Sequence, residues 1–193
     1  MSRLLVSLEY YLGEILARLP VILLAGIICG VLLWKKGKRL TSCRSVVKIL
    51  FVCYMAGLIS LTATPNNLWT DIWYRLRFHH DSGIRYHFFT FHYNLGPDFW
   101  RNFGMENLGN LLLYVPFGFL APLLWRKVEG WRTLALGLGL SFCVEVVQLF
   151  IDRSLDTNDL ILNTVGAAVG YGIFVLLRVV YPNFVKNCQK AEL

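Results

Sequence analysis

The chain has 193 residues, of which 56% are hydrophobic, 15% aromatic and only 16% charged, and its mean hydropathy is +0.53. A soluble domain carries about 25% charged and roughly 45–50% apolar residues. Here the apolar excess falls in blocks long enough to cross a bilayer, which excludes a soluble enzyme and a disordered chain. The net charge of +7 does not indicate nucleic acid as a partner, because the basic residues cluster beside the apolar blocks, where membrane topology explains them.

The apolar blocks predict an all-α integral membrane protein, a polytopic bundle of about five transmembrane helices. The predicted spans cover residues 19–34, 49–61, 107–125, 133–150 and 160–177. Residues 4–13 are amphipathic, and we expect them to lie at the membrane interface or to extend the first helix. The first span is followed by lysines and not by a cleavage site of small residues. We therefore expect this span to remain as a membrane anchor and not to be removed as a signal peptide. Residues 133–150 count as a span although Glu145 interrupts them, because polar loops flank them.

The basic residues predict the orientation. Twelve of the 19, including every lysine, fall in the loops after the first and third spans and in the tail. The positive-inside rule therefore places the N-terminus outside and the C-terminus in the cytoplasm, with residues 65–106 and 152–159 extracytoplasmic. We predict a single membrane domain over residues 1–193. Its parts are an added N-terminal helix and basic loop (1–45), a core (46–176) and a cytoplasmic tail (177–193).

Cysteine and histidine positions predict neither a disulfide nor a metal site. Of the five cysteines, three lie in spans, and Cys43 and Cys188 lie on the cytoplasmic side. We therefore expect no structural disulfide, and no Cys/His spacing is typical of zinc. No cofactor is predicted, because a phosphate-binding glycine loop and a nucleophile elbow are both missing from the sequence.

The long outer loop contains two recognisable segments. Residues 67–78 have the pattern of a short helix in the membrane interface, with apolar residues on one face and the pair Asp71 and Arg75 on the other. Residues 85–93 are rich in aromatic side chains. Two interpretations stay open for them: an aromatic belt at the headgroup level, or a surface that stacks on sugars or lipid-linked groups.

Polar residues recur inside the last three spans at helical spacing, so each set lies on one helix face. The candidate residues are Asn107, Asn110 and Tyr114 in the third span, Ser141, Glu145 and Gln148 in the fourth, and Asp156, Asp159 and Asn163 at the start of the fifth. All lie toward the outer side, and we expect them to line a polar cavity open to the outside. Gly166 and Gly170 follow on the fifth span and would let another helix approach closely.

Glu145 is the most informative of these residues. A charged side chain in the middle of a span costs about 2.5–3.5 kcal/mol, so we expect the carboxyl group to be neutral or paired, with Arg153 as the nearest partner. Intramembrane acids are usually functional. The alternative is structural: the amides bond across helices, and Asp156 or Asp159 caps the last helix.

Three ordered motifs resemble the VanZ-like family. They are Asn107-Leu-Gly-Asn110-Leu-Leu-Leu-Tyr-Val-Pro116-Phe-Gly118, then Ser141-x-x-x-Glu145-x-x-Gln148, then Asp156-Thr-Asn-Asp159-x-x-x-Asn163-Thr-x-Gly166. The second span, ending Leu61-Thr-Ala-Thr-Pro65, also resembles the opening helix of the family, and the similarity covers about residues 46–176. One departure is the sequence Asn94-Leu95-Gly96-Pro97-Asp98, where the family often has Asn-Leu-Ile-Pro-Phe.

The resemblance implies a bacterial plasma-membrane protein linked to resistance against teicoplanin, a glycopeptide antibiotic, without replacement of D-Ala-D-Ala termini. The first hypothesis is a non-enzymatic factor whose outward cavity binds an envelope lipid, a peptidoglycan precursor or the lipoglycopeptide itself. The second is a membrane-embedded enzyme that modifies an envelope lipid or glycan, with Glu145 as general acid or base and Asp156 or Asp159 as its partner. The third, a lipid transporter, is weakened by the lack of internal repeats.

Overall fold

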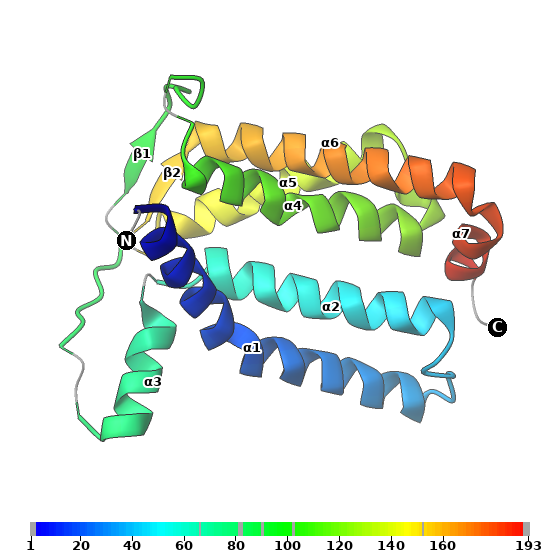
Figure 1. The fold of residues 1–193 in the computed structure, drawn as a ribbon, viewed down its shortest axis with the longest axis horizontal. Coiled ribbons are helices and arrows are strands. Elements are labelled where there is room, and N and C mark those ends of the chain that lie inside the picture. The colour runs from blue at the N-terminus through cyan, green and yellow to red at the C-terminus, as the bar shows by residue number, and fades with distance from the viewer. Residues whose placement is uncertain are drawn as a thin grey trace.

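The computed structural model describes residues 3–65, 67–80, 83–89, 91–101, 103–151 and 153–190. In chain order the elements are α1 (Arg3–Lys35), α2 (Cys43–Thr62), α3 (Leu68–Phe78), β1 (His92–Asn94), α4 (Met105–Leu124), the short 3-10 helix η1 (Arg126–Val128), α5 (Trp131–Gln148), β2 (Ser154–Asp156), α6 (Thr157–Val180) and α7 (Pro182–Gln189). The long helices lie side by side in one bundle, as Figure 1 shows.

In the described part of the chain, four helices are long and apolar enough to cross a membrane: α1, α2, α4 and α6. The protein is therefore a helical multi-pass membrane protein, as predicted. Helix α5, predicted as a further span, does not meet the same criterion because Arg132, Glu145 and Gln148 lower its hydropathy. It nevertheless packs against α4 and α6, and the count of five spans stays a prediction.

Helix α1 begins at Arg3, so residues 4–13 extend the first helix, which was one of the two alternatives. Pro20 lies inside this helix. Proline removes a backbone hydrogen bond and bends a helix, and Figure 1 shows α1 as two parts at an angle to each other. The part after the bend runs alongside α2.

Glycines bring α4 and α6 into direct backbone contact. A Cβ atom added to Gly166 would overlap the carbonyl of Leu111, one added to Gly170 the carbonyl of Val115, and one added to Gly118 the carbonyl of Ala167. Because small residues let helix backbones approach closely in membranes, this contact confirms the prediction made for Gly166 and Gly170. It aligns the polar residues at the start of α4 with those at the start of α6.

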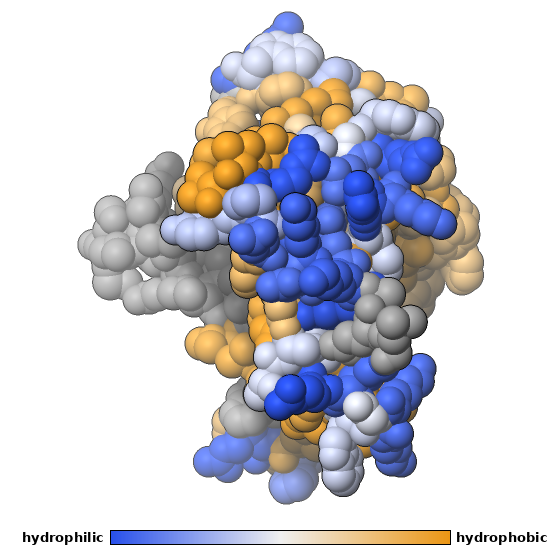
Figure 2. All heavy atoms as spheres, turned by 90° about the vertical axis from the view of Figure 1, so that its right-hand side faces the viewer, coloured by the Kyte–Doolittle hydropathy of each residue, from blue (hydrophilic) through white to orange (hydrophobic). Residues whose placement is uncertain are grey.

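The two ends of the bundle differ. One end, which we call the strand end, carries α3 and the strands β1 and β2, which pair in parallel with Asn94 opposite Asp156. The other, which we call the lysine end, carries the loop between α1 and α2 and helix α7. Figure 2 faces the lysine end and shows hydrophilic side chains gathered over it. The interfacial helix expected over residues 67–78 is present as α3, with Asp71 and Arg75 paired at 2.8 Å.

A disulfide joins Cys43 to Cys188 at the lysine end, with 5.1 Å between the two Cα atoms. The expectation of no structural disulfide was therefore wrong. That expectation relied on the cytoplasmic assignment of this end, since disulfides are rare in a reducing compartment. It also treated residues 177–193 as a tail, whereas α7 folds back onto the bundle and buries Val185 and Cys188. Gln189 secures this contact by donating to the carbonyl of Pro122 at 2.8 Å.

Candidate functional site

The predicted site residues gather at the strand end, where α4 and α6 begin and α5 ends. The group comprises Asn107, Asn110 and Tyr114 on α4, Ser141, Glu145 and Gln148 on α5, Arg153 and Asp156 between the helices, and Asp159 and Asn163 on α6. The structure thus brings together the three polar helix faces that the sequence predicts. We call Asn110, Tyr114, Ser141, Glu145, Asp159 and Asn163 the polar cluster.

Hydrogen bonds across the helices link members of the polar cluster. The Asn163 amide donates to the Ser141 hydroxyl at 2.9 Å, which joins α6 to α5. The Asn110 amide donates to the carboxylate of Asp159, which joins α4 to α6. These two bonds, together with the glycine contact between α4 and α6, hold the three helices in a fixed arrangement.

Glu145 is 2% exposed and lies at the centre of the polar cluster. Its Oε2 accepts a hydrogen bond from the backbone N–H of Asp156 at 2.8 Å. Glu145 therefore anchors the end of β2 just before α6 begins. Asp156 in turn caps α6, because its Oδ1 accepts from the backbone N–H of Asn158 at 2.8 Å.

Arg153 does not pair with Glu145 among the described residues, contrary to the expectation. Its guanidinium donates instead to the carbonyls of Leu61 and Thr62, at 2.9 and 3.3 Å. Helix C-termini leave carbonyls without intrahelical partners and carry partial negative charge, so the end of α2 competes for this cation. Burial lowers the pKa of Arg153, while the nearby carboxylates of Asp159 and Glu145 oppose that shift.

The end of α2 receives donors from four parts of the chain. Gln148 donates to the carbonyl of Thr62 at 3.0 Å, and Arg153 donates beside it. The carbonyl of Ser60 accepts from Arg18 of α1 at 3.0 Å and from Trp69 of α3 at 3.1 Å. Sequence analysis missed Arg18 and Trp69; the signal for Arg18 was a lone cation close to the first apolar block.

The outer loop is tied to the start of α6. The amide of Asn158 donates to the Asp98 carboxylate at 2.8 Å, and its Oδ1 accepts from the backbone N–H of Asp98 at 2.9 Å. Asn94 donates to Asp156 at 3.3 Å. Asp98 belongs to the segment that departs from the VanZ-like pattern, and here it anchors the loop. Asn94, Asp98 and Asn158 were not among the predicted site residues.

The aromatic segment packs beside the polar cluster. The rings of Phe89 and Phe91 lie edge-on to Phe150, with centroids 5.7 and 5.8 Å away. Phe150 lies two residues after the end of α5 and five residues after Glu145. Phe89 is 65% and Tyr93 69% exposed, so the segment presents aromatic faces at the strand end. This arrangement is compatible with both interpretations of the segment.

Two buried polar atoms of the cluster have no hydrogen-bond partner among the described residues: the Tyr114 hydroxyl and Asn163 Oδ1. Tyr114 is fully buried, and its hydroxyl lies close to the Ser141 hydroxyl and within electrostatic range of Glu145 and Asp159. Buried polar atoms are almost always paired in folded proteins. These two therefore have unused hydrogen-bonding capacity, and the expected outward cavity stays a prediction.

No group of three or more His, Cys, Asp or Glu side chains within the described ranges could hold a metal ion. The polar cluster contains two carboxyl groups, two hydroxyl groups and two carboxamides. They belong to Glu145 (buried), Asp159 (half-buried), Tyr114, Ser141, Asn110 and Asn163. These groups bind hydroxyls and amides, and a carboxylate among them can also accept a proton.

The chain belongs to the VanZ/LLP1 family, whose family model matches residues 51–178, about two thirds of the chain. The matched part begins in α2, ends in α6 and contains the whole polar cluster, but it excludes α1 and α7. No curated protein and no solved structure matches the chain. The family is linked to teicoplanin resistance, and the resemblance seen in the three sequence motifs is thereby confirmed.

Proposed function

We propose that this member of the VanZ/LLP1 family lowers sensitivity to teicoplanin-type glycopeptides by binding an envelope lipid, a peptidoglycan precursor or the drug at the strand end. The observation that carries the proposal is buried hydrogen-bonding capacity inside the polar cluster: Asn163 Oδ1 has no partner among the described residues, and the buried Tyr114 hydroxyl lies close to Ser141 without a well-formed bond. A buried polar atom without a hydrogen-bond partner destabilises a membrane protein, and ligand recognition is a reason to retain such an atom. The protein acts in the bacterial plasma membrane, and the charge rule places the strand end outside.

The chemistry of the surroundings favours an amphipathic ligand. Exposed rings of Phe88, Phe89, Phe91 and Tyr93 lie in the outer-loop segment that packs on Phe150 and pairs with β2 at the strand end, and they offer faces for sugars or acyl groups. The polar cluster at the same end of the bundle offers donors and acceptors. A lipid-linked glycan or a lipoglycopeptide carries both kinds of group, whereas a simple ion or a purely apolar molecule uses only one.

A membrane enzyme acting on an envelope lipid or glycan is the second candidate. One observation favours it: the carboxylates of Glu145 and Asp159 both lie within electrostatic range of the Tyr114 hydroxyl. In that case Glu145 transfers a proton during the reaction. One observation weighs against the enzyme: the Glu145 carboxylate accepts a hydrogen bond from the backbone of Asp156 and so already has a structural role.

The test measures the teicoplanin sensitivity of a susceptible bacterium that expresses wild-type or variant protein at equal membrane abundance. Tyr114→Phe removes a hydroxyl that lies within hydrogen-bonding reach of Ser141, a loss of about 0.5–1.5 kcal/mol, so the fold should be kept and the protection should be lost. Glu145→Gln can still accept from Asp156 and should also lose protection. The matched controls at the lysine end, Tyr181→Phe and Glu129→Gln, should protect like wild type.

Full protection by both Tyr114→Phe and Glu145→Gln would show that the polar cluster only holds the helices together. Mass spectrometry of envelope lipids incubated with purified protein then separates the two candidates. A binder leaves the lipids chemically unchanged. An enzyme yields a product that the Glu145→Gln variant does not form.

A further inference from the structure

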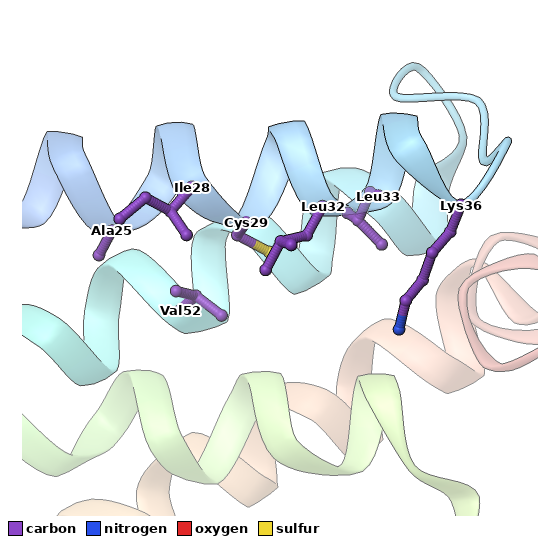
Figure 3. A pocket seen from close by; sticks show the side chains of 7 residues that line it. All are labelled: Ala25, Ile28, Cys29, Leu32, Leu33, Lys36 and Val52. Atoms are coloured by element: carbon purple, nitrogen blue, oxygen red, sulfur yellow. The ribbon is translucent and has the colours of Figure 1, made fainter.

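A second feature lies away from the polar cluster, toward the lysine end. A groove of about 400 Å³ runs along α1 beside α2, and Figure 3 shows the side chains that line it. The lining residues are Ala25, Ile28, Cys29, Leu32, Leu33, Lys36 and Val52. All but Lys36 are apolar or weakly polar, and Lys36 stands at the end of the row with its ammonium group directed to the same side as its neighbours (Figure 3).

The length of the groove matches one leaflet of a bilayer. Ala25 and Lys36 are eleven residues apart on one helix, which corresponds to about 16 Å at 1.5 Å per residue. The hydrocarbon core of a membrane is about 30 Å thick, so one leaflet accounts for about 15 Å. The apolar row therefore has the depth of one acyl chain, and Lys36 lies at the level of the lipid headgroup.

The cross-section of the groove excludes another helix. Its volume of about 400 Å³, spread over about 16 Å, leaves an area of about 25 Å². A helix with its side chains is about 10 Å across and needs about three times that area. Ile28 and Leu32, which are 50% and 54% exposed, are also larger than the small residues that are enriched where helices approach closely in membranes.

The position of α1 leaves the groove open to lipid. Of the four apolar helices, α1 is the least buried, and it packs against α2 and α3. The basic residues of the lysine end, Lys35, Lys36, Lys38 and Arg39 among them, create a positive potential at this level. A negatively charged headgroup is attracted to such a surface.

We propose that this groove holds one acyl chain of an anionic phospholipid from the leaflet at the lysine end, with its phosphate beside Lys36. The site is separate from the polar cluster at the other end of the bundle. It involves α1, which lies outside the residues matched by the family model. A phospholipid bound here would fix α1 against α2 without taking part in the proposed function.

The experiment uses the purified full-length protein in detergent micelles mixed with either phosphatidylglycerol or phosphatidylcholine with identical acyl chains. Native mass spectrometry then counts the lipids and the protein copies in each complex. Wild type should retain one phosphatidylglycerol in preference to phosphatidylcholine. Lys36→Gln should lower that preference about fivefold, the factor expected for one lysine beside an anionic headgroup, and the adjacent Lys35→Gln, which does not line the groove, should lower it less.

A second pair of variants tests the apolar part. Cys29→Trp fills the groove and should abolish retention of phosphatidylglycerol, whereas Ile27→Trp, at a position that is 62% exposed and does not line the groove, should leave it intact. Equal retention of the two lipids by wild type would overturn the proposal, and so would equal losses in Lys35→Gln and Lys36→Gln. A wild-type dimer that Cys29→Trp dissociates would overturn it too, because a second copy would then be the occupant.

Discussion

Replacing Gly170 by alanine should separate α4 from α6 and destabilise the protein. The added Cβ would overlap the carbonyl of Val115 and lie 3.0 Å from the backbone nitrogen of Phe119. Neither obstacle is the flexible tip of a side chain, so relief requires a shift of a whole helix. Overpacking of this kind costs about 1–3 kcal/mol. Gly172→Ala is a matched control two residues away, because a Cβ there meets no atom within 4 Å.

The control should gain stability rather than lose it. In a helix interior alanine is favoured over glycine by about 0.8–1.0 kcal/mol. Both variants share this gain, so they should differ by the cost of overpacking, about 1–3 kcal/mol. For a chain of this size 1 kcal/mol corresponds to about 2–4 °C in melting temperature. Thermal unfolding in detergent, followed by tryptophan fluorescence, should therefore place Gly170→Ala several degrees below Gly172→Ala, which should melt at or above the wild-type temperature.

The same displacement should reach the polar cluster. Gly166, one turn before Gly170, contacts the carbonyl of Leu111, the residue after Asn110. Moving α6 outward therefore lengthens the bond between Asn110 and Asp159. Equal melting temperatures for Gly170→Ala and Gly172→Ala would refute the reasoning, because the backbone contact between α4 and α6 would then be absent in the membrane protein.

Two further predictions concern the ends of the bundle. Arg153→Ala removes hydrogen bonds from a charged donor to the carbonyls of Leu61 and Thr62 and should cost about 1.5–3 kcal/mol, read as a lower melting temperature. Arg132→Ala should lower the melting temperature less, because the Arg132 guanidinium donates to the exposed carbonyl of Lys127 and lies over the exposed ring of Trp131. Equal losses in the two variants would contradict the role given to Arg153. At the lysine end, reduction of the Cys43–Cys188 disulfide should lower the free energy of unfolding by about 2–4 kcal/mol. The melting temperature of Cys43→Ser should be the same with and without reductant. If the lysine end faces the cytoplasm, alkylation of intact cells with a membrane-permeant reagent should modify both Cys43 and Cys188, because that compartment keeps thiols reduced. Five free thiols in the purified, air-oxidised protein would contradict the pairing of these two cysteines.

The spacing of polar residues predicted the site because helix geometry is local. Ser141, Glu145 and Gln148 share one face of any helix that contains them, and Gly166 and Gly170 mark a close helix contact for the same reason. A short loop between α5 and α6 then forces their polar faces together. The polar faces and the glycine contact could therefore be predicted from residues that are neighbours along one helix.

The contacts that depend on distant segments could not be read in this way. The end of α2 is bound by Arg18 and Arg153, 42 and 92 residues away from their acceptors, and no local pattern pairs them. The strands β1 and β2 have three residues each, too few to show alternation of polar and apolar side chains. Helix α7 falls in the segment predicted as a tail because it follows the last predicted span, although two of its residues complete the core at the lysine end.

The polar residues of the strand end fall into two groups: those whose side chains bind other parts of the fold, and those with an atom that remains available to a ligand. Gln148 and Arg153 bind backbone carbonyls of α2, and Asn158 binds the outer loop, so these side chains are committed to the fold. Tyr114 and Asn163 each keep one atom uncommitted: a hydroxyl that can donate or accept, and a carbonyl oxygen that can only accept. A ligand group that satisfies both must donate a hydrogen bond to Asn163 Oδ1, and it can either donate to or accept from the Tyr114 hydroxyl. A hydroxyl or an amide N–H meets this requirement, whereas a phosphate ester oxygen or a methyl group does not. Under the proposed function the ligand would therefore present a hydrogen-bond donor to Asn163 Oδ1, and Tyr114→Phe is the variant that separates ligand binding from the support of the helices.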